Sequence, residues 1–231
     1  MNIYHIHISG GNHFIEAYKD GWISVHSGSQ DIGRKVAEYY QNLAEKRILE
    51  DNISVNRDLC YLMGSDMEDY LYDVSVMQIF ANDNRMAILK AITEAMDGKI
   101  LEHINSIHNY INVGEMILRK GAISAQKGQI LVIPLNMRDG LLLCKGKGNA
   151  EWNNSAPHGA GRLYSRSEAK SRFTVEKYAE QMKGIYSSCI NKHTLDEAPF
   201  AYKDYKEIMD CVEPTVEILD RFLPIFNFKA K

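Results

Sequence analysis

Alternating apolar and polar residues predict short strands near the start of the chain. Residues 3–8 (IYHIHI) alternate histidine with isoleucine or tyrosine, and FIEAY (14–18) and GWISVHSG (21–28) follow, with a turn at KDG. A period of two is the spacing at which one face of a strand is buried. We therefore expect three strands in the first 28 residues.

Apolar residues then recur at helical spacing over a segment of about residues 34–98. The run 34–48 (RKVAEYYQNLAEKRI) predicts one helix, with Ser29 or Asp31 as its cap. Residues 66–96 predict a long second helix with a break near Asn82–Asn84, and residues 50–65 between the two look irregular.

The second half of the chain changes character. Short strand-like runs, separated by glycines and charged turns, occupy the stretch 104–149. Two helices are predicted after it, at about 167–183 and 203–222, with an extended run around 187–191 between them. No repeat or linker-like tract interrupts the pattern, so we expect one mixed α/β (α+β) domain over residues 1–231.

Composition limits the class of protein. The 231 residues are 45% hydrophobic and 25% charged with a net charge of −3, so a nucleic-acid role needs a local basic cluster. The four cysteines show no C-x-x-C spacing, which is typical of free thiols in a reducing compartment. No signal peptide or membrane-span pattern occurs in the sequence, and we expect a cytoplasmic protein without membrane contact.

Histidines beside turn-forming residues are the first chemical feature. His13, His26, His108 and His158 each have a polar or glycine neighbour, in SGGNHFIE, SVHSGS, SIHNYI and APHGAGR. Imidazole is the commonest metal ligand and the commonest acid–base group near neutral pH. Their separations match no local metal motif, so the fold has to bring them together.

Basic residues beside glycines are the second feature. They are Arg119, Lys120, Lys145, Lys147, Arg162 and Arg166. Arginine forks and glycine-rich turns both suit phosphate oxygens, which predicts a phosphate-bearing ligand, although KGKGN is not a Walker A motif. A neutral imidazole is also a nucleophile at phosphorus, and the spacing does not separate that role of His158 from metal ligation.

Ten motifs in order resemble the RtcB family of RNA-splicing ligases. They are GGNHFIE (10–16), HSGSQDIG (26–33), Q-x-x-A-x-x-NR (78–85), HNY (108–110), RKGAISAQKGQ (119–129), IPLNMRDG (133–140), KGKGN (145–149), SAPHGAGRLYSRSEAK (155–170), EAPFAYKD (197–204) and FNFKA (226–230). The resemblance covers nearly the whole chain, and it implies an RtcB-like fold of stacked β-sheets with flanking helices.

The resemblance implies a GTP- and manganese-dependent ligase. Such enzymes join RNA ends with a 2′,3′-cyclic phosphate or 3′-phosphate to 5′-hydroxyl ends through a histidine–GMP intermediate. By motif position, His158 resembles the guanylylated nucleophile, and His13, His26 and His108 resemble the metal ligands. The positions that resemble nucleotide contacts are Asn12, Glu16, Gly159, Gly161, Tyr202 and Lys229. The positions expected to contact RNA or phosphate are Lys120, Arg162 and Arg166.

One family segment has no counterpart in this sequence. The family carries an upstream D-x-x-C-G segment whose Asp and Cys complete the manganese site, and neither Cys60 nor Cys144 has that context. Gln30 also stands where the family's HSGS segment usually continues with arginine. We therefore expect a C-terminal portion, with a fold incomplete at its N-terminus, that works with a separate N-terminal half. The resemblance implies RNA (tRNA halves or broken RNA), GTP and archease as partners.

Two rival functions stay open at this point. The first is an inactive RtcB-like remnant or regulator that binds guanine nucleotide or RNA without ligating. The second is a histidine metallohydrolase, against which the lack of an identifiable carboxylate base near the histidines counts.

Overall fold

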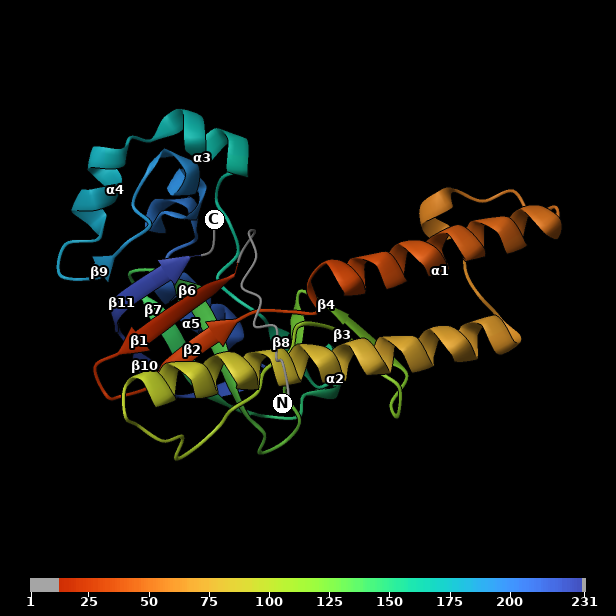
Figure 1. Cartoon of the computed structure of the whole chain (residues 1–231), viewed down its shortest axis with the longest axis horizontal. Helices are drawn as coiled ribbons and strands as arrows, with labels where there is room; N and C mark the ends of the chain where they lie inside the picture. The colour runs from red at the N-terminus through yellow and green to blue at the C-terminus, as the bar shows by residue number, and fades with distance from the viewer. Residues whose placement is uncertain (1–12, 230–231) are drawn as a thin grey trace.

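The computed structural model describes residues 13–229, which form a mixed α/β fold with several sheets (Figure 1). The fold class expected from the sequence is confirmed. The strand predicted at residues 3–8 lies outside the described residues, as does Asn12. That the whole chain forms one domain stays a prediction.

A four-stranded sheet contains the first strands of the chain. Its order is β2 (Ile23–His26), β1 (Phe14–Tyr18), β11 (Pro224–Lys229) and β9 (Tyr186–Ser187). The pairs β2–β1 and β1–β11 are antiparallel, and β11–β9 is parallel. The two strands predicted at 14–18 and 21–28 are therefore confirmed, and the C-terminal strand β11 pairs directly with the first described strand.

A three-stranded antiparallel sheet carries most of the buried side chains. Its order is β10 (Val216–Phe222), β7 (Gly140–Gly146) and β6 (Ile130–Asn136). Successive residues of β7 point to opposite faces, as the pleat requires. Leu141 packs with Tyr18 and Phe222, whereas Leu142 packs with Ile208 and Val212 of α5 (Tyr205–Val212). This sheet therefore lies between the four-stranded sheet and α5.

The helix predicted over 203–222 is wrong in its second half. Helix α5 ends at Val212, a turn follows, and residues 216–222 form strand β10. Pro214 has no amide hydrogen to continue a helix. Val216 to Phe222 instead pair with Gly146 to Leu141 of β7, which is a long-range partner that local spacing does not reveal.

Two long helices, α1 (Gln30–Glu50) and α2 (Gly64–Ala95), lie side by side (Figure 1). Helix α1 and the first part of α2 extend away from the sheets, whereas the second part of α2 runs back alongside β2 (Figure 1). Ser29 stands at the N-cap position of α1 but makes no side-chain cap hydrogen bond. The expected break near Asn82–Asn84 is absent from α2, which is continuous. The asparagine side chains there bond to other segments rather than to their own helix: Asn84 to Ser27, and Asn82 to Asn105.

Two short helices replace the single helix expected at 167–183. They are α3 (Arg166–Arg172) and α4 (Val175–Gln181), and Thr174 caps α4 by accepting a hydrogen bond from the Lys177 amide. The extended run predicted around 187–191 is only the two-residue strand β9.

Short strands and 3-10 turns complete the fold. The strands are β3 (Asn109–Asn112), β4 (Ile117–Lys120), β5 (Ala122–Ser124) and β8 (Ser155–Pro157), paired β3–β4 and β5–β8. The 3-10 turns are η1 (Arg57–Leu59), η2 (Ala150–Trp152), η3 (Lys192–Glu197) and η4 (Pro199–Ala201). None of the helices within residues 13–229 combines the length and apolar character needed to cross a membrane.

Candidate functional site

Four histidines from distant parts of the chain form a row, which we call the histidine row: His13, His26, His108 and His158. His13 precedes β1, His26 ends β2, His108 precedes β3 and His158 follows β8. The ring centroids of His13 and His26 lie 6.2 Å apart, those of His26 and His108 5.2 Å, and those of His108 and His158 4.7 Å. The fold therefore brings together the histidines that the sequence singled out.

His158 is held by one backbone contact that fixes its proton. Its Nδ1 lies 2.6 Å from the carbonyl oxygen of Gly121. A carbonyl only accepts, so Nδ1 carries the hydrogen and Nε2 of the neutral ring keeps its lone pair. Gly121 has a φ of +68°, a conformation that side-chain-bearing residues rarely adopt. The turn after β4 thus orients His158 with a nucleophilic nitrogen available.

The middle of the histidine row is uncharged. Burial lowers the pKa of His26 to about 3, and the neighbouring His108 and His13 lower it further. Burial also lowers the pKa of His108, with a contribution from His158. Nδ1 of His108 is buried and makes no hydrogen bond. Neutral rings of this kind are competent metal ligands.

The loop after β2 is anchored by helix α2. Asn84 donates to Ser27 Oγ at 3.0 Å, and Arg85 donates to the Ser27 carbonyl at 3.1 Å. Gln30, where the family pattern has arginine, donates to Ser27 Oγ at 2.9 Å. The long continuous helix therefore holds the segment that follows His26.

A cavity of about 300 Å³, the glycine pocket, opens on one side of the row. It is lined by the predicted nucleophile and by all the predicted nucleotide contacts that fall within residues 13–229: Glu16, His158, Gly159, Gly161, Tyr202 and Lys229. A Cβ on Gly159 would lie 3.1 Å from the Pro134 carbonyl oxygen, and Gly161 has a φ of +72°. Both glycines therefore have a physical reason to lack a side chain.

Glu16 is a buried carboxyl group in this pocket. Tyr18 donates to its Oε2 at 2.8 Å, and only 4% of the residue is exposed. Burial raises the pKa of Glu16 to about 7, against the hydrogen bond from Tyr18 and the charge of Lys229. Near neutral pH, Glu16 is therefore present both as a protonated carboxyl group, which can donate a hydrogen bond, and as a carboxylate, which only accepts.

Two carboxylates that the sequence analysis did not single out, Asp196 and Glu197, lie among the cations. Both are buried at the end of η3. Glu197 accepts from Tyr202 at 2.6 Å and from Lys229 at 2.8 Å. Burial raises the pKa of Glu197, but Lys229 and Tyr202, together with Arg162, outweigh it, so the pKa lies below its usual value. The sequence feature that could have identified Glu197 is its place as the first residue of the motif EAPFAYKD.

The predicted basic cluster is only partly assembled. Arg162 lines the glycine pocket, where it pairs with Glu197 at 3.2 Å. Arg166 pairs with Asp196 at 3.0 Å, and Lys120 is exposed next to Gly121. The three other basic residues of the predicted cluster do not line the glycine pocket. Arg119 is buried and bonds Ser155, Tyr110 and Asn153, Lys147 pairs with Glu213, and Lys145 is exposed on β7.

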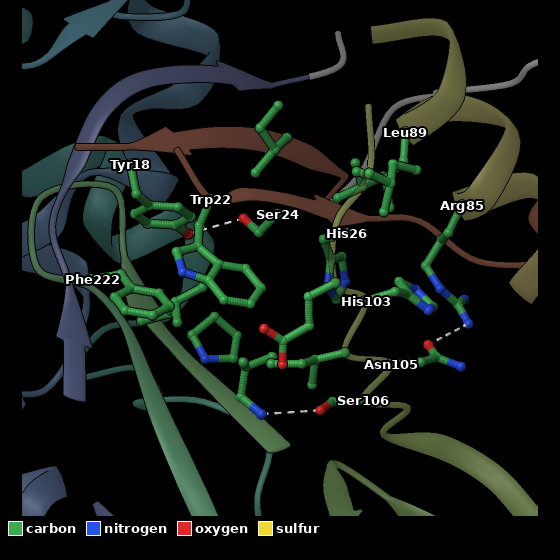
Figure 2. Close-up of a pocket in the computed structure, with 18 of the residues that line it drawn as sticks. Tyr18, Trp22, Ser24, His26, Arg85, Leu89, His103, Asn105, Ser106 and Phe222 are labelled. Carbon is green, nitrogen blue, oxygen red and sulfur yellow. Dashed lines mark hydrogen bonds between the residues drawn. The ribbon is translucent and has the colours of Figure 1, made fainter. Parts of the chain in front are cut away.

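A second cavity of about 420 Å³, the aromatic pocket, lies on the other side of the row. Figure 2 shows Tyr18, Trp22 and Phe222 together at one end and His26, His103 and Arg85 toward the other. Trp22 stacks on Phe222 with centroids 5.4 Å apart. His26, His108 and His158 line both cavities, so the row forms part of their shared wall.

The described residues supply part of a metal site. Neutral imidazoles and the unpartnered Nδ1 of His108 suit a transition metal. Within residues 13–229, however, no three His, Cys, Asp or Glu side chains converge as a complete ligand group. Manganese also favours oxygen ligands, and within residues 13–229 no Asp or Glu completes a group of three potential ligands with these histidines. The fit of a metal to the described residues is therefore partial.

Comparison with known proteins identifies the relatives of this chain. The family model described as tRNA-splicing ligase RtcB matches residues 7–230. RNA-splicing ligase RtcB of Escherichia coli K12 is 37% identical, over 90% of this chain and 57% of its own length. The tRNA-splicing ligase RtcB of Nanoarchaeum equitans is 26% identical, over 96% of this chain and 59% of its own length. The chain thus spans a little over half the length of these curated relatives, and it belongs to the RtcB tRNA-splicing ligase family.

Proposed function

We propose that this chain carries the nucleotidyl-transfer centre of a GTP- and manganese-dependent RNA ligase. The ligase joins RNA ends bearing a 2′,3′-cyclic phosphate or 3′-phosphate to ends bearing a 5′-hydroxyl. The observation that carries the proposal is the hydrogen bonding and position of the His158 ring. Its Nδ1 hydrogen is committed to the Gly121 carbonyl, and its ring lines a pocket with Glu16, Tyr202 and Lys229.

The first step is attack of His158 Nε2 on the α-phosphorus of GTP. The Nε2–P bond forms, the bond from the α-phosphorus to the bridging oxygen breaks, and pyrophosphate leaves. The Nδ1–H bond to Gly121 stabilises the positive charge that develops on the ring. A 2′,3′-cyclic phosphate end is first opened by water, which breaks the bond from phosphorus to the 2′-oxygen and gives a 3′-phosphate and a 2′-hydroxyl. An oxygen of the RNA 3′-phosphate then displaces the histidine from the GMP phosphorus. Finally the 5′-hydroxyl attacks the activated 3′-phosphate, its proton passes to solvent, and GMP leaves.

His13, His26 and His108 are the residues that would hold manganese in this chain. The metal, when bound, would offset the triphosphate charge and orient the α-phosphorus. The lowered pKa values of His26 and His108 keep these two imidazoles neutral and ready to ligate at physiological pH. The described residues offer no complete ligand group, so we expect a separate N-terminal half to supply the Asp and Cys ligands.

RNA is the proposed polymer substrate, either tRNA halves or broken RNA. Lys120, exposed one residue before Gly121, and Arg166, whose side chain is half exposed, are the proposed phosphate contacts. Arg162 is committed to Glu197 and to the Asp196 carbonyl, so its contact with a phosphate requires exchange of these partners. Archease is proposed as an activating partner on the family resemblance alone.

A guanylylation assay tests the proposal. The chain is incubated with α-labelled GTP and manganese, alone and with a polypeptide carrying the D-x-x-C-G segment. We expect an acid-labile, alkali-stable protein adduct that His158→Ala abolishes. His193→Ala is the matched control, because His193 is exposed on η3 and lines neither pocket.

The outcomes separate the rival functions. Absence of the adduct in both mixtures contradicts the ligase proposal. GTP binding without an adduct would instead support the alternative of an inactive remnant or regulator. An adduct that needs the second polypeptide would support a ligase whose metal site is shared between two chains.

A further inference from the structure

We propose that Glu197 is a positioning residue that gives the glycine pocket its preference for guanine by fixing Tyr202 and Lys229. The identity of the ligand rests on the proposed function. Glu197 is placed at the wall of the pocket itself, and no role in the family resemblance accounts for it.

Glu197 is the hub of the polar contacts in this pocket. Its Oε2 accepts from the Tyr202 hydroxyl at 2.6 Å and from Lys229 Nζ at 2.8 Å, and its Oε1 accepts from Arg162 at 3.2 Å. Glu197 is 5% exposed and Lys229 is 7% exposed. At such burial each group is costly unless paired, so the contacts hold all of them in fixed positions.

The contacts also determine what Tyr202 and Lys229 offer to a ligand. An ionised carboxylate only accepts, so the Tyr202 hydrogen is committed to Glu197. Arg162 donates to the same hydroxyl oxygen at 3.3 Å, which leaves one acceptor site on Tyr202. Lys229 commits one of its three N–H groups to Glu197 and keeps two donors. Tyr202 therefore presents one acceptor site to a ligand, and Lys229 presents two N–H donors.

This pattern suits guanine better than adenine or a phosphate chain. Guanine places the acceptors O6 and N7 side by side, which suits the two donors of Lys229, and its N1–H can donate to Tyr202. Adenine carries the N6 donor in the place of O6 and an acceptor at N1, so it reverses both matches. The ionised carboxylate of Glu197 lines the pocket and disfavours phosphate beside it. The base therefore fits against this group, and the phosphates fit toward the histidine row.

The test compares two carboxylates that are neighbours in sequence. Glu197→Gln and Asp196→Asn remove the same charge one residue apart. Asp196 pairs its side chain with Lys170 and with Arg166, which also pairs with Glu197 Oε1 at 3.3 Å, and neither cation lines the pocket. Binding of GTP, ATP and tripolyphosphate to the 231-residue chain is measured by calorimetry without divalent metal. We expect Glu197→Gln to weaken GTP binding by about tenfold or more without weakening tripolyphosphate binding. Asp196→Asn should keep the wild-type ratio of GTP to ATP affinity.

A change of charge alone predicts a different result. If Glu197 acted only through its charge, Glu197→Gln would strengthen GTP and tripolyphosphate binding together, and an unchanged ratio of GTP to ATP affinity would overturn the proposal. Tyr202→Phe provides a second route should Glu197→Gln fail to fold. It should lose the same preference for GTP, and retention of that preference would overturn the proposal. Where both variants fold, the double variant should lose no more than either alone. A wild-type chain that binds no GTP even with manganese and the D-x-x-C-G polypeptide would instead overturn the proposed function.

Discussion

Substitution of Gly121 by alanine tests whether the turn that orients His158 needs glycine for its backbone conformation or for space. Gly121 has a φ of +68°, and a residue with a Cβ in this region costs about 1–2 kcal/mol. The added Cβ would lie 3.4 Å from His158 Cε1 and 3.5 Å from Nδ1, which is contact without severe overlap. We therefore expect Gly121→Ala to lower the free energy of unfolding by about 1–2 kcal/mol.

Gly128→Ala is the matched control. Gly128 has a φ of +84°, and an added Cβ there would meet no atom within 4 Å. Urea unfolding followed by circular dichroism should give the same loss for both variants, and thermal melting should show a fall of about 2–8 °C in Tm. A loss of about 4 kcal/mol or more in Gly121→Ala alone would refute the reasoning, because contact with the His158 ring would then dominate.

Three further predictions concern stability. The pKa of Glu16 is raised in the folded state from 4.5 to about 7, so the folded chain binds the extra proton and stability falls as pH rises through this range. Relative to Glu16→Gln, the wild-type free energy of unfolding should fall by about 3 kcal/mol between these pH values, and a rise would contradict the assignment. Arg119→Lys should cost about 2–4 kcal/mol in urea unfolding, because one ammonium group cannot replace three buried guanidinium contacts; a cost near zero would count against their role. Leu142→Ala should cost about 2–5 kcal/mol, since Leu142 is 0% exposed, and a loss well below 2 kcal/mol would indicate a core that collapses around the gap.

Local sequence predicted the elements whose partners are near in the chain. Strands β1 and β2 form a hairpin, and β6 and β7 form another, so their alternating residues pair with neighbours. The region 216–222 was different, because its residues fit a helical pattern and only pairing with β7 selects the strand. Helix α2 likewise runs through Asn84 because that side chain finds a distant partner in Ser27.

The candidate site was predicted as residue types rather than as geometry. The turn neighbours of the four histidines identified them, but the contact of His158 with Gly121 depends on the pairing of β5 with β8, which places Ala122 opposite Pro157. The sequence did not predict a role for Glu197, because a single glutamate in a helical turn is typical of an exposed residue. Its importance appears only when Lys229, at the far end of the chain, lies 2.8 Å away.

The most direct test of the central claim is the location of the adduct within the chain. After incubation with GTP, manganese and the D-x-x-C-G polypeptide, the modified peptide is isolated at alkaline pH and the phosphoramidate is assigned by mass spectrometry and phosphorus NMR. We predict GMP on Nε2 of His158, because Nδ1 is committed to the Gly121 carbonyl. GMP on a lysine, on another histidine or on Nδ1 of His158 would contradict the account.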